Sequence, residues 1–242
     1  MKKMAVQLDH ERAMKWLVYD LFPVMLDCQQ QVSNLEFLER KSLSIGQGTW
    51  IHSFFNQLHH QYYFILVTQM AKVLDNAGTN QRISLPTLLT KLGSSQTDST
   101  SFDGFFAKHA KSRLGMFRLP PTSHRWSSFV EVQADMKSVR DRFKEHRDTI
   151  KRIIDQRNTM MAHTDPDRPD FAYIPLSDLR SVFEVAMDIW STLANNLHPR
   201  LTFDFTPANC WQLQNLILNM ESLEEHRNFV RQQLFKSAAL RS

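Results

Sequence analysis

The sequence contains little glycine and little cysteine, and each shortage excludes a class of site. Six glycines in 242 residues leave little room for a glycine-rich phosphate-binding loop, and none occurs. The two cysteines, Cys28 and Cys210, do not suggest a disulfide framework and carry no signature of a catalytic nucleophile. A glycine-rich phosphate loop and a reactive thiol are therefore not expected.

Long apolar runs are missing as well. The first residues are basic, but polar and charged residues at positions 9–12 interrupt the apolar stretch that would have to follow them. A signal peptide or a membrane anchor needs such a stretch. We therefore expect a cytoplasmic protein with no membrane partner.

Residues that bind metals are not clustered in the sequence. His59 and His60 are adjacent, so on a helix their side chains point about 100° apart, and neither has a second histidine or a carboxylate three or four positions away. The other histidines considered for such a site are isolated: His109, His124, His146, His198 and His226. The sequence predicts no metal site and no cofactor.

Helical periodicity runs through most of the chain, whose apolar residues recur at steps of three and four. The predicted helices cover residues 9–40, with an interruption at Pro23, and then 50–75, 85–91, 102–114, 129–157, 179–197 and 207–235. Ser84 is expected to cap the helix over 85–91, and residues 93–101 are expected to form a loop. The predicted fold is an all-α, up-and-down bundle of about five to seven helices, forming a single domain over 1–242.

Basic charge is concentrated in one predicted helix. The formal net charge of the chain is +4. Residues 137–157 hold eight basic and four acidic residues, so the net positive charge of this stretch alone equals that of the whole chain. Four of the basic residues recur at steps of four, three and four, so they form a stripe along the helix: Arg140, Lys144, Arg147 and Lys151. This stripe is either a solvated face with local ion pairs or a track that binds nucleic acid.

Arg157 occupies a position where an apolar residue would be expected. It ends a helical stripe that otherwise consists of Phe129, Val132, Met136, Val139, Phe143, His146, Ile150 and Ile154. A guanidinium group is rarely buried without a partner. Arg157 is therefore expected either to form an internal ion pair or to face a polar gap or a subunit interface.

His163 follows Arg157 by six positions, which is about 240° around an ideal helix. The two side chains can cooperate only if the helix ends or bends between them, or if it faces a second copy of itself. Residues 164–170 are rich in types that stop helices. We therefore expect His163 near a helix C-terminus, where the backbone carbonyls favour protonated imidazole.

These residues resemble the signature of the HEPN superfamily of helical domains, which have an arginine, usually a polar residue next, and a histidine four to six residues after the arginine. Arg157, Asn158 and His163 match that order, and the fuller pattern through Asp165 resembles the AbiU-like branch, named for abortive phage infection. A second stretch supports the same branch, with Leu74-Asp75 followed by the Ser-Leu-x-x-Leu-Leu pattern at 84–89. The resemblance covers about residues 50–197.

The resemblance implies a metal-independent endoribonuclease that acts as a homodimer, with the two motifs meeting in a cleft. RNA would be cut by attack of its own 2′-hydroxyl, leaving a 2′,3′-cyclic phosphate. Arg157 would hold the phosphate, His163 would act as acid or base, and Asn158 would orient the histidine or the ribose. Arg140, Lys144, Arg147 and Lys151 would bind RNA, with Asp75 and Asp165 supporting the site.

Two further interpretations stay open. In the first interpretation the chain is a non-catalytic module that binds RNA or nucleotides. In the second it is a purely structural interaction protein. A toxin or anti-phage role would imply an antitoxin or a phage-derived trigger as a partner. The branch paired with nucleotidyltransferase antitoxins has tyrosine where this chain has Asp165, so we do not infer tyrosine modification.

Overall fold

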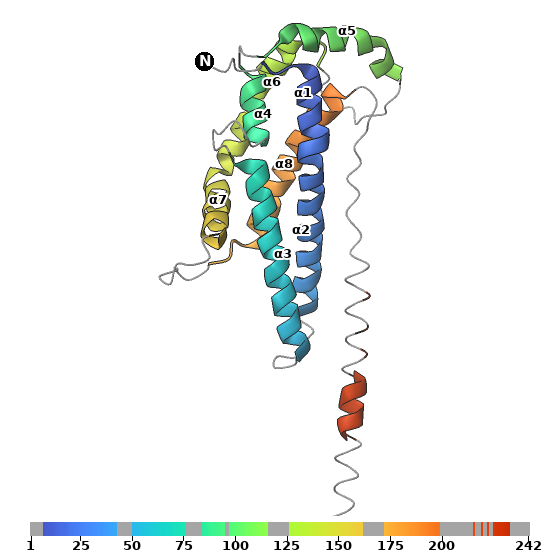
Figure 1. The fold of residues 1–242 in the computed structure, drawn as a ribbon, viewed down its shortest axis with the longest axis vertical. Helices are drawn as coiled ribbons and strands as arrows, with labels where there is room; N and C mark the ends of the chain where they lie inside the picture. The colour runs from blue at the N-terminus through green and yellow to red at the C-terminus, as the bar shows by residue number, and fades with distance from the viewer. Residues whose placement is uncertain are drawn as a thin grey trace, which may run out of the picture. The chain divides into compact units, whose positions relative to one another are not determined.

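The computed structural model describes residues 7–42, 50–75, 84–94, 97–115, 126–161, 172–198 and 225–232, together with residues 215, 219 and 222. Within these ranges the chain is all-α, as predicted, and its only strand-like pairing is an isolated bridge between Leu8 and Thr97. The described residues form eight named α-helices, more than the predicted five to seven, and one π-helix. Figure 1 labels the helices α1 (His10–Lys15), α2 (Phe22–Ser42), α3 (Trp50–Leu74), α4 (Leu85–Leu92), α5 (Ser99–Gly115), α6 (Phe129–Glu145), α7 (Arg147–Met161) and α8 (Leu176–Leu197), and the π-helix η1 (Trp16–Leu21) lies between α1 and α2.

The chain divides into two compact units. The first consists of Met1–Cys28 and Ile65–Thr206, and the second of Gln29–Phe64 and Pro207–Ser242. The predicted site residues all belong to the first unit. A single domain over 1–242 with a core at about 50–197 stays a prediction.

Helix α8 forms the core of the first unit. It packs against α1, η1, α6 and α7, and it runs beside α1 (Figure 1). Its buried side chains include Trp190, which is fully enclosed and donates a hydrogen bond from Nε1 to the Leu17 carbonyl at 3.0 Å. Burying one large apolar side chain stabilises a fold by about 1.5–3 kcal/mol, so this helix anchors the unit.

The interruption predicted at Pro23 is present as the π-helix η1, which ends two residues before it. Pro23 has no N–H, so a regular α-helix would leave the carbonyl four residues earlier without its donor. In the structure the Phe22 N–H bonds to the Leu17 carbonyl, five residues back, and the same carbonyl accepts the Trp190 indole. The wider turn thus accommodates both the proline and the hydrogen bond from α8.

Helix α4 has the ends that its sequence predicts. The Ser84 hydroxyl accepts a hydrogen bond from the Thr87 N–H at 3.3 Å, and Pro86 occupies an early position that needs no N–H. Gly93 is the C-cap, and its N–H bonds to the Leu89 carbonyl at 3.0 Å. The loop predicted over 93–101 is shorter in the structure, because α5 already begins at Ser99.

The helix predicted over 129–157 is two helices. Helix α6 ends at Glu145, His146 adopts φ −105° and ψ 12°, and α7 begins at Arg147. The break changes which residues face the core, because Ile153 is fully buried while Ile154 is half-buried. A prediction based on apolar spacing alone missed it, since the three-and-four pattern continues through the break.

The second unit contains a small apolar cluster. Buried Leu38 and Phe55 pack with four half-buried residues: Phe37, Phe54, Leu58 and Tyr62. The C-terminal helix predicted over 207–235 is confirmed at residues 215, 219, 222 and 225–232, where the side chains are exposed. The rest of that prediction lies outside the described residues. No helix among the described residues is long and apolar enough to cross a membrane.

Candidate functional site

Arg157 lies on the buried face of α7. Ile153, one turn before it, is fully buried, and Met160, three residues after it, is 2% exposed. Steps of four and three place these residues on one side of the helix. Arg157 therefore lies on a face with buried apolar residues, as predicted, but Ile153 and not Ile154 is the buried residue one turn before it, and the predicted stripe does not continue unbroken through the break at His146.

Asp75 is the acidic partner of Arg157. It follows the last residue of α3, and its carboxylate Oδ2 lies 3.0 Å from Nη2 of Arg157. Only 11% of each side chain is exposed. Of the alternatives left open by the sequence, the internal ion pair is present, and it joins the end of α3 to α7.

Asn158 also binds the guanidinium of Arg157. Its side-chain oxygen accepts hydrogen bonds from Nε and Nη2 of Arg157, at 3.1 and 2.9 Å. The oxygen of Asn158 is bound to the neighbouring guanidinium, and a role of Asn158 in orienting the histidine or the ribose stays a prediction. One edge of Arg157 is thus fixed by Asp75 and Asn158 together.

The third nitrogen of Arg157, Nη1, has no acceptor among the described residues. Nη1 is buried, and it makes no hydrogen bond within the part of the chain that the structure describes. Leaving a buried charged donor unsatisfied costs more than losing an ordinary hydrogen bond. This nitrogen is the donor of Arg157 that still lacks a partner among the described residues.

His163 and Asp165 lie outside the described residues. Helix α7 ends at Met161, two positions before His163. The structure therefore brings together Arg157, Asn158 and Asp75 among the predicted site residues, and the roles expected of His163 and Asp165 stay predictions.

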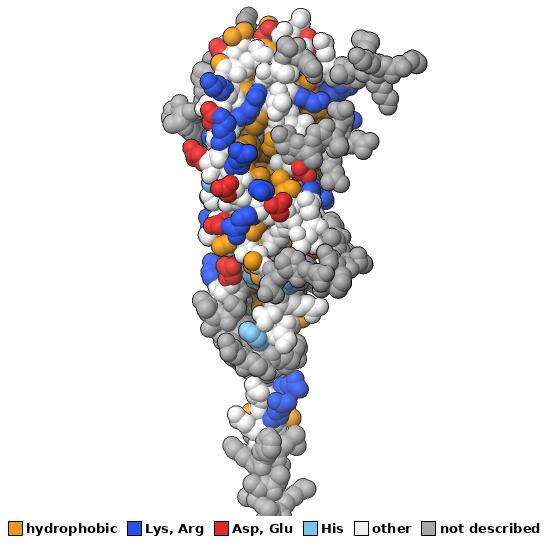
Figure 2. All heavy atoms as spheres, turned by 90° about the vertical axis from the view of Figure 1, so that its left-hand side faces the viewer, with side chains coloured by type: hydrophobic (Ala, Val, Ile, Leu, Met, Phe, Trp, Pro, Cys, Tyr) orange, Lys and Arg blue, Asp and Glu red, His pale blue; other side chains and the backbone are white. Residues whose placement is uncertain are grey.

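The predicted basic stripe has members in different environments. Arg147 and Lys151 on α7 are exposed, whereas Lys144 is paired with Asp141 at 2.6 Å. Arg140 is half-buried and donates from Nη2 to the Leu89 carbonyl at 3.1 Å, so it binds the C-terminal end of α4. Figure 2 shows basic and acidic side chains interspersed on the face of the molecule that carries α6 and α7.

Sequence reasoning missed two features near this face. The contact of Arg140 with α4 could not be read from spacing on one helix, and a role of Arg140 in RNA binding stays a prediction. Gln156 donates to the Ala172 carbonyl at 2.9 Å, which ties α7 to the segment before α8. No group of three or more metal-binding side chains occurs among the residues that the structure describes.

The helical fold and the buried Arg157 at the head of the Arg-Asn-x-x-x-Ala-His pattern define a HEPN-type protein. The family model HEPN_AbiU2, described as AbiU2, matches residues 1–209, which is wider than the 50–197 expected from motifs. The chain belongs to the AbiU2 family of HEPN domains, whose name connects it with abortive infection. The comparisons with curated proteins and with solved structures gave no match.

Proposed function

We propose that this AbiU2-family protein is a metal-independent endoribonuclease that cleaves RNA by attack of the ribose 2′-hydroxyl on the adjacent phosphodiester. The observation that carries the proposal is the geometry of Arg157. Two of its nitrogens are held by Asp75 and Asn158, while Nη1 is buried without an acceptor among the described residues. A phosphate oxygen would satisfy that donor with a charge-assisted hydrogen bond.

Arg157 is suited to stabilising the transition state because it is already positioned. Charge accumulates on the non-bridging phosphate oxygens as the 2′-oxygen attacks, and a fixed cation in a poorly hydrated site stabilises that charge strongly. The bonds from Asp75 and Asn158 restrict the guanidinium before the substrate arrives. Asp75 is therefore a positioning residue in this scheme.

His163 supplies the proton transfer. An imidazole can accept the proton of the 2′-hydroxyl or donate one to the leaving 5′-oxygen, because the unperturbed pKa of histidine in general lies close to neutrality. The bond between phosphorus and the 5′-oxygen breaks as the 2′-oxygen bond forms, which leaves a 2′,3′-cyclic phosphate. In the proposed homodimer the motif of each subunit faces that of the other. The two His163 side chains, one acting as the base and the other as the acid, therefore come from two chains.

RNA would reach the site along α7. Arg147 and Lys151 are exposed on the helix that carries Arg157, and they would contact successive phosphates. A role as a toxin or anti-phage effector would then require control by an antitoxin or by a phage-derived trigger.

A second candidate is a binding module that does not cleave. The favouring observation is that Asp75 already pairs with Arg157, because a neutralised arginine stabilises less of the charge that develops during cleavage but can still donate hydrogen bonds to bound RNA. The two functions differ in whether RNA is cut and in whether His163→Ala changes what the protein does to RNA.

The test is incubation of mixed cellular RNA with the purified protein in excess EDTA. His163→Ala and Arg157→Ala are prepared in parallel, and His226→Ala serves as the matched histidine control at an exposed position outside the motif. We expect cutting by the parent and by the control variant, with cyclic phosphate ends detected by mass spectrometry. A substrate carrying a 2′-deoxyribose at the cleavage position should stay intact.

Equal cutting by the parent and by His163→Ala would overturn the nuclease proposal, because it would show a contaminating activity. If no protein cuts RNA but parent and His163→Ala bind it equally, the binding module is the correct function. Mixing parent subunits with an excess of His163→Ala subunits tests the dimer, since a cleft that needs the histidines of both chains predicts that mixed dimers are inactive and that cutting falls by more than dilution of the parent explains.

A further inference from the structure

The C-terminal helix predicted over 207–235 takes no part in the proposed nuclease chemistry. The family match ends at residue 209, so almost all of this helix lies beyond it. The structure shows helix with exposed side chains at every described position of this segment: 215, 219, 222 and 225–232. Phe229 is 58% exposed and Val230 is 40% exposed. Most helical stability in proteins comes from packing of an apolar face, so we expect a partner for this helix.

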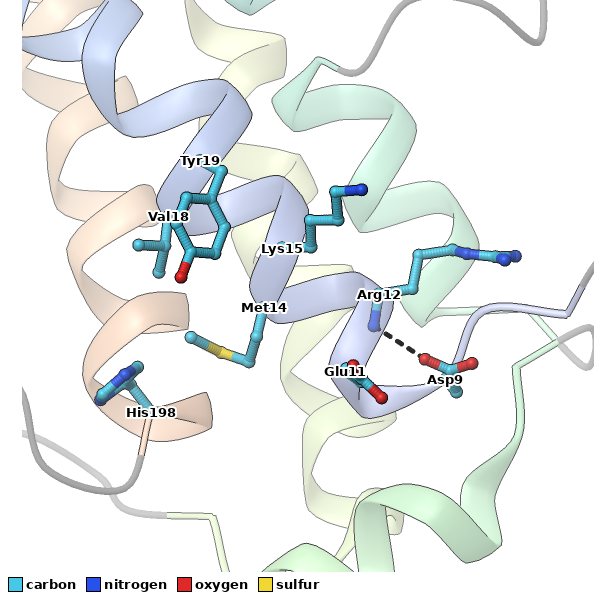
Figure 3. Close-up of a pocket in the computed structure, with 8 residues that line it drawn as sticks. All are labelled: Asp9, Glu11, Arg12, Met14, Lys15, Val18, Tyr19 and His198. Atoms are coloured by element: carbon cyan, nitrogen blue, oxygen red, sulfur yellow. Dashed lines mark hydrogen bonds between the residues drawn. The ribbon is translucent and has the colours of Figure 1, made fainter.

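The segment that leads to the C-terminal helix leaves the first unit at His198. The Leu197 carbonyl accepts a hydrogen bond from Nε2 of His10 at 2.7 Å, which ties the end of α8 to α1. His198 lies at a cavity of about 810 Å³ over α1 and η1 (Figure 3), opposite residues of these two helices: Met14, Val18 and Tyr19. The chain therefore starts toward the C-terminal helix from a fixed point.

The apolar residues of the C-terminal helix recur with the heptad spacing of a coiled coil, in which positions a and d are apolar. Six of the seven a and d positions between residues 213 and 234 hold an apolar residue, and the seventh holds Arg227. The a positions are Leu213, Met220, Arg227 and Leu234, and the d positions are Leu216, Leu223 and Val230. Such a seam, sustained over three heptads, is typical of a helix that pairs with another helix.

The seam is narrower than the apolar face of a helix in the core. Helix α8 buries adjacent residues at four places along its length: 182–183, 189–190, 193–194 and 196–197. This doubling produces the wide face that a helix needs when several helices surround it. Among the e and g positions that flank the seam of the C-terminal helix, only Ile217 is apolar. A narrow seam fits a single partner helix with the same pattern.

The polar face of the C-terminal helix favours a second copy over a membrane surface. A helix that lies in the lipid interface carries many lysines and arginines on its polar face. Residues 211–232 contain three glutamates, two arginines and no lysine. Because this charge is nearly balanced, two copies of the helix can approach each other without strong repulsion.

Charges in and beside the seam select the orientation of the two copies. In a parallel, in-register pair Arg227 would lie opposite itself, and His226 at a g position would lie opposite Arg231 at an e position. The first contact places two positive charges together, and the second does so when the histidine is protonated. In an antiparallel pair a residues pack against d residues, so Arg227 faces an apolar side chain of the second copy while its charged end extends to solvent.

We propose that the C-terminal helix is a self-association element, which pairs with the same helix of a second copy of this chain as an antiparallel coiled coil. A seam of 22 residues extends over about 33 Å, so six apolar side chains of each copy leave solvent together. Arg227 weakens the pair but restricts its orientation, as a single polar residue at an a position does. The inference goes beyond the proposed ribonuclease activity and does not depend on it.

Sedimentation equilibrium of the full-length protein measures the association. Leu223→Glu should weaken it about a hundredfold, because a carboxylate would be placed in the apolar seam. Ser222→Glu is the matched control, since it adds the same charge at the neighbouring, exposed c position and should leave the association unchanged. Arg227→Leu should strengthen the association about tenfold, because an apolar residue then completes the seam. Circular dichroism verifies that each variant is folded.

Distances between spin labels measured by pulsed electron paramagnetic resonance distinguish this surface from the motif around Arg157. Cys28 is buried, and burial raises the pKa of its thiol, so it should not take a label, while Cys210→Ser removes the other cysteine. One preparation is labelled at Asn215→Cys and a second at Gln232→Cys, both at exposed positions. Antiparallel pairing brings the two labels side by side, whereas parallel pairing separates them by about 25 Å along the helix axis.

The proposal is supported if Leu223→Glu weakens the association while Ser222→Glu and Arg157→Ala do not. It is also supported if Leu223→Glu keeps the mass of a dimer but loses the distance between the labels, since the remaining contact is then the motif interface.

A monomeric parent would overturn the proposal, whether the C-terminal helix stays alone or packs on its own chain. A distance that fits only parallel pairing would also overturn it, as would an Arg227→Leu variant that associates no more tightly than the parent. Loss of association in Arg157→Ala but not in Leu223→Glu would place the whole contact at the motif. None of these results depends on whether the protein cuts RNA.

Discussion

Arg157 and Asp75 are separated by 82 positions in the sequence, yet their side chains form a nearly buried ion pair at 3.0 Å. The pair connects the C-terminal end of α3 with the helix that leads to His163. The side-chain oxygen of Asn158 accepts hydrogen bonds from the same guanidinium, so Asp75 and Asn158 together fix its orientation. The proposed catalytic cation is therefore held by a contact that the fold alone creates.

Asp75→Asn should destabilise the protein by roughly 2–4 kcal/mol, because it leaves the Arg157 charge nearly buried without its counter-charge. Urea unfolding followed by circular dichroism measures the change. Asp178→Asn is the control, since its partner Arg152 lies 3.6 Å away and both side chains are substantially exposed, so a change within about 0.5 kcal/mol is expected.

The double variant Asp75→Asn with Arg157→Gln should be more stable than the sum of the two single changes predicts. Additive effects would contradict the ion pair as the source of the destabilisation. If Asp75 positions Arg157 for RNA cleavage, the single variant should also lose turnover while binding RNA with nearly unchanged affinity.

The salt dependence of RNA binding should depend on the exposed members of the basic stripe. Lys151→Gln and Arg147→Gln should each reduce the slope of log K against log salt by about one, as expected for the loss of one phosphate contact. Fluorescence anisotropy with a labelled RNA measures the slope. An unchanged slope in both variants would place the RNA elsewhere.

Lys144 should behave differently because Asp141 already neutralises it at 2.6 Å. This hydrogen bond with Lys144 is the largest cause of the lowered pKa of Asp141. Lys144→Gln should therefore reduce the slope less than Lys151→Gln does. Asp141→Asn should strengthen RNA binding, and weaker binding in that variant would contradict the predicted track along this face.

Gly93→Ala should destabilise the protein by about 1 kcal/mol. A Cβ at this position would collide with the guanidinium of Arg140 and displace it from the Leu89 carbonyl. Losing a hydrogen bond from a charged donor costs about 1.5–3 kcal/mol, and the lower entropy of the unfolded chain returns only about 0.4–1 kcal/mol.

Gly104→Ala is the matched control, because a Cβ there meets nothing within 4 Å and the residue lies inside α5. That change should stabilise the protein by up to about 1 kcal/mol through helix propensity. Thermal unfolding of both variants measures the contrast. A stabilised Gly93→Ala variant would show that the Arg140 contact contributes little.

His198 should make the fold sensitive to acid. Burial, and secondly the neighbouring charge of His10, lower the pKa of His198 below its ordinary value of 6.5. Below pH 6.5 the unfolded chain therefore binds a proton that the folded chain binds only at lower pH, so stability falls as the pH decreases through this window. His198→Gln should reduce the loss of stability between neutral pH and the lowered pKa.

The control for this prediction is His226→Gln, at an exposed position of the C-terminal helix. The midpoint of urea unfolding at several pH values gives the comparison. The same decline in the parent, in His198→Gln and in the control would contradict the assignment of the acid sensitivity to His198.

Local features of the fold were predictable where a few neighbouring residues decide them. Ser84 with Pro86 marks the start of α4, and its hydroxyl accepts the expected backbone hydrogen bond. Pro23 marks an interruption, although the spacing did not indicate that it would take the form of a π-helix. The break at His146 was missed because apolar residues keep their period on both sides of it.

The candidate site was predictable only in part. Apolar spacing identified Arg157 as an arginine in a buried position, and the resemblance to the AbiU-like branch singled out Asp75 as a supporting residue. Neither could show that Oδ2 of Asp75 lies against Nη2 of Arg157. The cavity over α1 was not predicted at all, since its residues are ordinary for an amphipathic helix.

The sequence by itself determined the helical class of this protein, the position of Arg157 on an apolar stripe and the motif that places the chain among HEPN proteins. These follow from periodicity and residue type over short stretches, which local physical chemistry controls. The tertiary structure decided that Asp75 is the partner of Arg157, that Arg140 binds the end of α4, and that Tyr19 and His198 face one cavity. Those relationships join residues far apart in the chain, so they arise only when the helices pack.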